Sequence, residues 1–253
     1  TGLLRPHEAL RFERPFRAPH HTASLVALVG GGQVPKPGEI TLAHRGVLFL
    51  DELSEFQRSV LEALRQPLEE GTITISRSRG ALTFPAKFIF VAATNPCPCG
   101  YYNDEEVPCK CSSGDLVKYQ RKLSGPLLDR IDLQVFVPRL SYEELANSIP
   151  HTSEPDELRR RILRTRERQY ARFMETPLLT NSEMSSRETE RFTPLTDEAR
   201  DLLKLAVKKY HLSTRSYYRI LKVSRTIADL SEQDTINASH IGEALQYRLH
   251  RES

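Results

Sequence analysis

Residues 46–53 read GVLFLDEL: a glycine, four apolar residues, two carboxylates and a leucine. A short apolar run bounded in this way is typical of a strand that is buried on both faces of a parallel sheet. Ligands of parallel α/β sheets bind outside the carboxyl ends of the strands, which is where Asp51 and Glu52 would lie. The stretch therefore predicts an α/β fold with a candidate site at the end of this strand.

A helix and further strands follow this stretch. The apolar positions of residues 57–66 recur at helical spacing, and residues 88–93 form a second apolar run that ends before Asn95. Residues 132–137 have the pattern of a third strand. Strands that alternate with helices are typical of a parallel sheet that helices cover.

The second half of the chain has helical spacing alone. Helix candidates cover residues 156–173, 197–210, 214–231 and 238–248, and Asn237 is a favourable N-cap for the last of them. We therefore place a domain boundary near residue 140. It separates an α/β core (1–140) from an all-helical domain (141–253).

The composition is that of a globular protein with a sizeable core. The chain has 253 residues, of which 39% are hydrophobic and 27% charged, and its net charge is only +3. No stretch approaches the roughly 20 consecutive apolar residues of a membrane helix. The first residues lack the apolar core of a secretory signal, so we expect a soluble protein of the cytoplasm without a membrane partner.

Residues 72–85 have the pattern of a β-hairpin with a basic tip. Polar and apolar residues alternate on both sides of a turn signal that contains Arg77 and Arg79. Arginines at such a tip could contact nucleic-acid phosphates without reading the base sequence. The predicted helix over residues 156–172 carries seven further arginines. Charge of that kind more often solvates a helix or pairs with a neighbouring subunit.

All four cysteines lie in one short segment, at Cys97, Cys99, Cys109 and Cys111. In a reducing compartment this clustering favours a metal over two disulfides. The nine residues between the two Cys-x-Cys pairs are enough to fold a loop back around a structural Zn²⁺. The alternative is a set of free buried thiols. His20, His21 and His44 lack ligand spacing, and we expect them to be hydrogen-bonded or exposed rather than to bind metal.

The polar residues that end the two apolar strands fit phosphoryl transfer to water. One carboxylate, Asp51, would hold Mg²⁺, and the second, Glu52, would polarise the attacking water. Asn95 at the end of the next strand could orient that water. The alternative interpretation of Asp51 and Glu52 is a charge pair at a helix N-terminus.

Several long segments resemble one family, the magnesium-chelatase-like AAA+ ATPases, and within it most closely the ComM/YifB competence-protein branch. The four segments in the core are RPFRAPHH (14–21), GEITLAHRGVLFLDEL (38–53), NPCPCG (95–100) and SGPLLDRIDL (124–133). The resemblance continues through LSTRSYYRILKVSRTIADL (212–230) and HIGEALQYR (240–248). It therefore covers nearly the whole chain.

The resemblance implies a role for each candidate residue. Asp51 and Glu52 would be the Walker B pair, and Asn95 would be sensor 1. Arg130 would be the arginine finger, and Arg215 would be sensor 2. Because Arg130 precedes the third predicted strand, it should lie near the opposite edge of the sheet from Asp51, where it can serve only a neighbouring subunit. The alternative is a surface ion pair of Arg130 with an adjacent aspartate.

The resemblance also implies ATP and Mg²⁺ as cofactors, a hexameric ring, and DNA as the substrate of a helicase or branch-migration motor. The sequence contains no GxxxxGK[ST] phosphate-binding loop, so we expect a fragment that lacks the Walker A segment. Two alternatives stay open. One is a chelatase-type ATPase subunit that drives metal insertion, and the other is an oligomerisation or DNA-binding fragment that does not use nucleotide.

Overall fold

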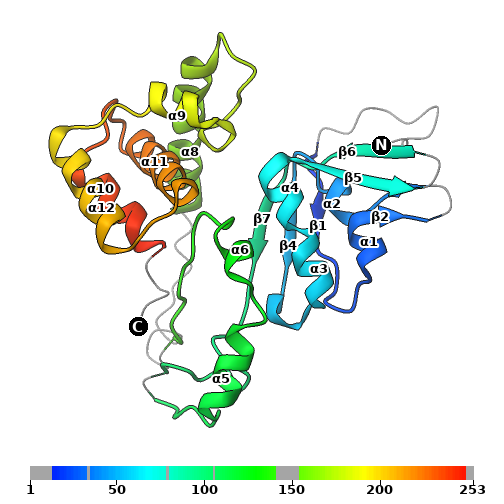
Figure 1. The fold of residues 1–253 in the computed structure, drawn as a ribbon. Coiled ribbons are helices and arrows are strands. Elements are labelled where there is room, and N and C mark those ends of the chain that lie inside the picture. Colours follow the sequence, from blue (N-terminus) through cyan, green and yellow to red (C-terminus); the bar gives the residue numbers. More distant parts are fainter. Residues whose placement is uncertain (1–12, 33–34, 78–79, 105, 141–153, 249–253) are drawn as a thin grey trace. The chain divides into compact units, whose positions relative to one another are not determined.

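The computed structural model describes residues 13–32, 35–77, 80–104, 106–140 and 154–248 (Figure 1). The chain divides into two compact units, Thr1–Ile131 and Asp132–Ser253. We describe each unit separately. The expected domain boundary near residue 140 stays a prediction, because residues 141–153 lie outside the described part of the chain.

A three-stranded parallel sheet forms the centre of the first unit. Its strands are β1 (Phe16–Arg17), β4 (Val47–Leu50) and β7 (Ile89–Ala92), in the order β1-β4-β7. Leu48 and Leu50 of β4 are completely buried, as the unbroken apolar run predicts. The predictions of a strand over the GVLFLDEL stretch and of a second over residues 88–93 are confirmed.

Short helices complete this unit. They are α1 (Leu25–Val29), α2 (Glu39–Leu42), α3 (Arg58–Ala63), α4 (Arg65–Glu70), α5 (Ser113–Gln120), α6 (Gly125–Leu128) and the 3₁₀ turn η1 (Leu53–Glu55). A small antiparallel ribbon joins β2 (Gly30–Gly31) to β3 (Lys36–Pro37). Leu28, Ile40 and Leu61 from three of these helices pack with the buried leucines of β4 in one hydrophobic cluster.

The helix predicted over residues 57–66 is interrupted in the structure. It is formed by α3, which ends at Ala63, and α4, which begins at Arg65. The interruption has a local cause, because Pro67 has no N–H to donate to the Ala63 carbonyl. Gly71 then ends α4 in a left-handed conformation, with φ of 65°.

The predicted hairpin is present as β5 (Thr72–Arg77) and β6 (Gly80–Pro85). The two strands are antiparallel, with Thr72 opposite Pro85 and Arg77 opposite Gly80. The side chains of Thr74 and Thr83 hydrogen-bond across the ladder, with 3.1 Å between their Oγ1 atoms. The alternation of polar and apolar residues was therefore a sufficient signal for this element.

The prediction of a third strand over residues 132–137 is wrong. These residues have no regular secondary structure and belong to the second compact unit. The Gln134 N–H donates to the Tyr247 carbonyl over 2.9 Å, and the Asp132 carboxylate pairs with Arg219. The segment thus bonds to the helical unit instead of joining a sheet ladder. Val135 and Val137 are exposed.

The second unit is otherwise helical. Its elements are α8 (Glu154–Phe173), η2 (Asn181–Glu183), α9 (Ser186–Phe192), α10 (Asp197–Lys209), α11 (Thr214–Leu230) and α12 (Ala238–Gln246). Four of these helices match the predicted ranges to within two residues, and Asn237 caps α12 as expected. The short helix α9 was not predicted, although the spacing of Ser185 and Glu188 is typical of a capping box, and the two residues form one in the structure.

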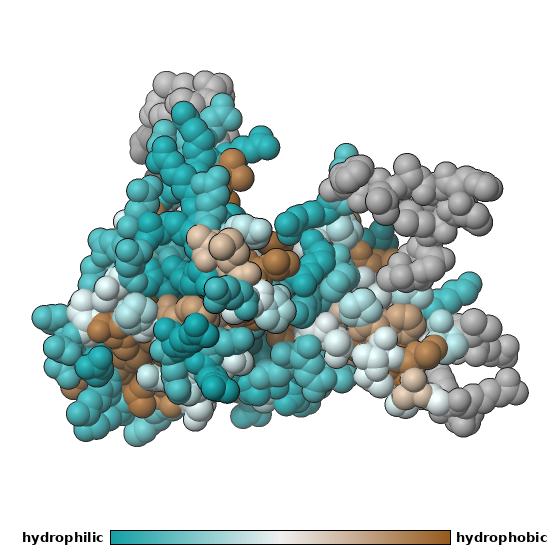
Figure 2. Space-filling model, turned by 90° about the horizontal axis from the view of Figure 1, so that it is seen from above, coloured by the Kyte–Doolittle hydropathy of each residue, from teal (hydrophilic) through white to brown (hydrophobic). Residues whose placement is uncertain are grey.

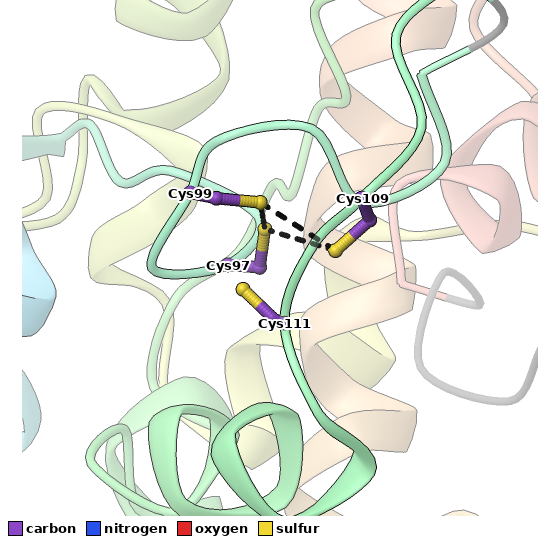
Figure 3. Close-up of side chains that lie close together, drawn as sticks. All are labelled: Cys97, Cys99, Cys109 and Cys111. Atoms are coloured by element: carbon purple, nitrogen blue, oxygen red, sulfur yellow. Dashed lines mark hydrogen bonds between the residues drawn. The ribbon is translucent and has the colours of Figure 1, made fainter.

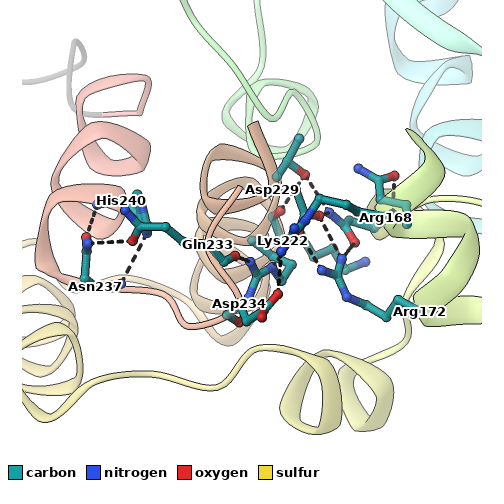
Figure 4. A network of polar contacts seen from close by, with 12 residues as sticks. Arg168, Arg172, Lys222, Asp229, Gln233, Asp234, Asn237 and His240 are labelled. Atoms are coloured by element: carbon teal, nitrogen blue, oxygen red, sulfur yellow. Dashed lines mark hydrogen bonds and ion pairs between the residues drawn. The ribbon is translucent and has the colours of Figure 1, made fainter. Parts of the chain in front are cut away.

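A buried charge network joins the helices of this unit (Figure 4). Asp229 on α11 accepts hydrogen bonds from Arg172 on α8 (2.7 Å, Nη1 to Oδ2) and from the Asn181 amide (2.8 Å). Arg225, one turn earlier on α11, donates to the same carboxylate over 3.2 Å. Arg225 also donates to the carbonyls of Gln233 and Asp234, so its guanidinium is bonded although it is buried.

The part of the surface drawn in Figure 2 is mostly hydrophilic, with the hydrophobic side chains gathered in separate patches. Among the residues that the structure describes, no helix combines the length and the apolar character needed to cross a membrane.

Candidate functional site

Two carboxylates lie directly beyond the carboxyl end of β4. Asp51 and Glu52 are both exposed, and the Glu52 N–H donates to Asp51 Oδ1 over 2.9 Å. Glu52 has a φ of 51°, in the left-handed region, where a residue other than glycine has a conformational cost of about 1 kcal/mol. The chain thus turns sharply after the strand and leaves both carboxylates accessible. The helix that follows is a single 3₁₀ turn, so these carboxylates do not cap a long helix.

The backbone after β7 runs beside this turn. The Ala93 N–H donates to the Leu50 carbonyl (3.0 Å), and the Leu53 N–H donates to the Ala93 carbonyl (2.9 Å). These two bonds continue the ladder beyond the strand ends. They bring the segment that contains Asn95 to the same edge of the sheet as the two carboxylates, and Asn95 is exposed there. The structure therefore brings together three residues that the sequence singled out.

A histidine from a third strand contacts this edge. His21 follows β1, and its Nδ1 lies 2.9 Å from Glu52 Oε2. The His21 ring packs edge-on against Phe56, with 6.4 Å between ring centroids, and lies tilted against the His20 ring, with 4.1 Å between centroids. Sequence reasoning expected a hydrogen-bonded or exposed histidine but not this partner. The available signal was the position of His21 just after a strand of the same parallel sheet.

Arg130 lies away from the two carboxylates, in contact with α4. Its Nε lies 3.1 Å from Glu69 Oε2, its Nη1 donates to the Pro126 carbonyl over 2.6 Å, and its side chain is only 11% exposed. Gly71, two residues after Glu69, accepts a hydrogen bond from the N–H of Ala86, which lies just before β7. Arg130 therefore sits near the amino ends of the strands, opposite the edge that carries Asp51 and Glu52.

Arg215 belongs to the helical unit. It is exposed in the first turn of α11, where the Ser213 side chain caps the helix by accepting from the Ser216 N–H. Arg219, one turn further along, forms the ion pair with Asp132. Asp51 and Glu52 belong to the other compact unit, so the sensor 2 role of Arg215 stays a prediction.

The basic hairpin tip is described only in part. Arg77 ends β5 opposite Gly80, but its side chain and the whole of Arg79 lie outside the described residues. The DNA-contact role of these two arginines is therefore not tested.

The four cysteines converge on one point (Figure 3). Their sulfur atoms all lie within 4.8 Å of one another, and none of the four forms a disulfide. Hydrogen bonds from the backbone N–H groups of Tyr101 and Lys110 lower the pKa of the Cys99 thiol to about 6. Burial raises the pKa of Cys111 to about 12. The cluster has the donor set and the convergence of a metal centre.

Comparison with known proteins identifies the family of this chain. The profile of the family described as "Magnesium chelatase, subunit ChlI" matches residues 2–145, and that of its C-terminal region matches residues 152–248. The chain belongs to this magnesium-chelatase-like family of AAA+ ATPases, and its α/β core and helical unit correspond to part of the AAA+ fold.

Within the family, the chain is similar to proteins with several different names. It is 50% identical to "Competence protein ComM" of Haemophilus influenzae over 93% of this chain and 45% of that protein. It is 43% identical to "Uncharacterized protein YifB" of Escherichia coli, over 93% of this chain and 46% of that protein. A "Magnesium-chelatase subunit ChlI" of Chlorella vulgaris is 31% identical over 28% of this chain and 20% of its own length. The chain spans about half the length of these ComM and YifB relatives.

Proposed function

We propose that this chain supplies the Walker B, sensor and arginine-finger residues of a ring-forming AAA+ ATPase that moves DNA strands, as a helicase or branch-migration motor. The observation that carries the proposal is the meeting of Asp51, Glu52 and the Asn95 segment at one strand edge. The similarity to a protein named for competence supports DNA as the substrate. Because the chain has no GxxxxGK[ST] pattern, residues outside it would provide the phosphate-binding loop.

The donor set at this edge fits Mg-ATP. Exposed carboxylate oxygens are the ligands that Mg²⁺ prefers, and Asp51 would supply one. Bound Mg²⁺ would neutralise charge on the phosphates. Glu52 would accept the proton of the attacking water, and Asn95 would orient that water. The left-handed turn at Glu52 and its contact with His21 support this role, because both restrict the position of the carboxylate.

Arg130 would complete the site of a neighbouring subunit. Its place near the amino ends of the strands supports action in trans, because that edge lies away from Asp51 and Glu52. A closed ring presents such an arginine at every interface, and we propose a hexamer. Arg215 would contact nucleotide from the helical unit as sensor 2.

The β5–β6 hairpin would contact DNA through Arg77 and Arg79. Its regular two-strand ladder supports this, because a rigid ribbon can carry a basic tip away from the body of the core. The motor would work in the cytoplasm, a reducing compartment in which cysteines rarely form disulfides, and the four cysteines of this chain are free. A structural Zn²⁺ at these cysteines would be a further cofactor.

A second candidate is a subunit that drives metal insertion, which the similarity to magnesium-chelatase subunits favours. That similarity covers only 28% of this chain, whereas the competence-type similarity covers 93% of it. We therefore prefer the DNA motor.

The test uses a protein of the relatives' length that contains these residues and a phosphate-binding loop. Glu52→Gln should lower DNA-stimulated ATP hydrolysis by about 100-fold while ATP still binds, because the general base is lost and Asp51 remains. Glu70→Gln at the end of α4 is the matched control and should leave turnover unchanged. Unchanged turnover in Glu52→Gln would refute the Walker B assignment. Normal ATP hydrolysis without any DNA stimulation would refute the DNA motor.

A further inference from the structure

The sulfur atoms of the four cysteines have the spacing of one tetrahedral metal centre. The Cys97–Cys99, Cys99–Cys109 and Cys97–Cys109 sulfur distances are 3.3, 3.5 and 3.8 Å. A tetrahedral Zn²⁺ with Zn–S bonds of about 2.3 Å places its sulfur ligands about 3.8 Å apart. Three mutually close sulfurs form a triangle, whereas two disulfides would give two separate close pairs.

The loop that carries the cysteines is folded back by its own hydrogen bonds. The Gly100 N–H donates to the Cys97 carbonyl over 3.0 Å, and Gly100 has a φ of 84°, which glycine adopts without strain. Asp104 Oδ1 accepts from the N–H groups of Glu106 (2.9 Å) and Val107 (2.8 Å). The two Cys-x-Cys pairs are thus brought together by the local chain, and Cys97 is fully buried.

The cysteine centre lies between the Asn95 segment and helix α5 along the chain. On one side, Cys97 follows Asn95 by two residues. On the other side, Cys111 directly precedes Ser112, whose side chain and backbone form a capping box with Asp115 at the start of α5. The centre therefore joins the end of the Asn95 segment to the first turn of α5.

Helix α5 in turn contacts the segment after Glu52. The Tyr119 hydroxyl and Ser54 Oγ lie 2.6 Å apart in a buried hydrogen bond, and Ser54 follows Glu52 by two residues. Lys122, just beyond α5, donates to both carboxylate oxygens of Glu55 at 3.1 and 3.3 Å. A continuous path of bonds thus runs from the cysteine centre through α5 to η1.

We propose that Cys97, Cys99, Cys109 and Cys111 bind one structural Zn²⁺. We further propose that this centre, through α5, fixes the position of the Asn95 segment relative to the Glu52 turn. Thiolates are ligands that Zn²⁺ prefers, and four of them leave no open position for catalysis. The metal site stands on the cysteine geometry alone. Its consequence for ATP hydrolysis rests on the proposed function.

The first experiment measures metal in the 253-residue chain, which needs no nucleotide. Elemental analysis of protein purified under reducing conditions should find about one zinc per chain. Replacement by Co²⁺ should give the visible absorption of a tetrahedral thiolate complex, and Cys99→Ser or Cys109→Ser should remove most of it. Ser113→Ala, on α5 next to the ligands, is the control and should retain the metal. Absence of stoichiometric metal, iron in place of zinc, or two disulfides in the reduced preparation would overturn the zinc site.

The second experiment measures amide hydrogen exchange before and after removal of the metal by a chelator. Exchange in residues 53–55 and 93–95 should become about tenfold faster and should recover when Zn²⁺ is added back, while α10 to α12 stay unchanged. Tyr119→Phe should keep the zinc but show faster exchange in residues 53–55. Metal removal without any effect on these residues would overturn the bracing role. Because both readouts are independent of ATP, they separate failure of this proposal from failure of the proposed ATPase.

Discussion

His21 Nδ1 lies 2.9 Å from Glu52 Oε2, a contact that joins the turn after β1 to the turn after β4. With its proton on Nδ1, the imidazole donates to the carboxylate that we propose as the general base. The edge-on packing of His21 against the buried Phe56 ring restricts the imidazole in turn. We infer that His21 is a positioning residue for Glu52.

The first prediction concerns this histidine. In an ATPase as long as the relatives, His21→Ala should lower kcat by about tenfold with little change in KM for ATP. Glu52 remains present in this variant, but its carboxylate loses the contact that holds it in position. His20→Ala is the comparison variant. His20 hydrogen-bonds to Thr22 and packs against the His21 ring, but its described contacts do not include Glu52, so its loss should have the smaller effect. Steady-state hydrolysis assays measure both variants. Equal losses in the two would contradict the positioning role.

The second prediction concerns the arginine finger. Arg130→Ala should lower ATP turnover by about 1,000-fold and leave nucleotide binding nearly intact. Mixing this variant with Glu52→Gln should restore part of the activity, because a mixed ring can contain a site with both groups. Glu69→Gln removes the same ion pair but keeps the arginine, so this variant should retain most of the ATP turnover. If Glu69→Gln were equally inactive, or if no mixture recovered activity, a role in trans would be excluded.

The third prediction concerns the hairpin tip. Changing Arg77 and Arg79 together to Ala should weaken DNA binding and reduce the slope of log affinity against log salt by about two, one for each lost phosphate contact. The control changes Arg159 and Arg160 on the exposed surface of α8 to Ala. Fluorescence anisotropy with labelled DNA over a salt series gives the slopes. A larger loss in the α8 variant would assign the DNA contact to that helix instead.

The fourth prediction concerns the stability of the helical unit. Asp229→Ala should lower the free energy of unfolding by about 3–5 kcal/mol, because it leaves the charges of Arg172 and Arg225 without their buried carboxylate. Asp234→Ala is the control. That carboxylate pairs with Arg168 but is 95% exposed, so its loss should cost at most about 1 kcal/mol. Urea unfolding followed by far-UV circular dichroism measures both, and equal costs would contradict the buried network.

The fifth prediction is the pH dependence of the same network. Burial opposes ionisation of Asp229, but hydrogen bonds from Arg172 and Asn181 and the nearby arginine charges outweigh it, and the pKa of this carboxyl lies below its ordinary value. A lowered pKa in the folded state stabilises the unit above about pH 4, and this contribution is lost as the pH falls through the folded-state pKa. The urea midpoint should therefore decrease from pH 5 to pH 2. Asp229→Asn should show a smaller decrease, and an unchanged slope would contradict the assignment.

Local sequence patterns were sufficient for β4, β7, the β5–β6 hairpin and four helices of the second unit. The apolar run ending in Asp51 and Glu52 became β4, alternation became the β5–β6 hairpin, and Asn237 capped α12. Each of these signals acts over a few neighbouring residues. Pro67 also indicated the break between α3 and α4, because proline has no N–H to donate to the carbonyl four residues earlier. These features can be predicted from the sequence because the interactions that produce them join residues that are close together along the chain.

The sequence by itself determined the α/β class, the helical second half, the candidate carboxylates and the clustered thiols. Only the tertiary structure decided that residues 132–137 bond to Tyr247 and Arg219 rather than form a strand, since a strand is stable only when another strand pairs with it. The tertiary structure likewise paired His21 with Glu52 and Tyr119 with Ser54. Each of these pairs joins residues that are far apart in the sequence, and such contacts form only when the packing of whole elements places the two side chains side by side.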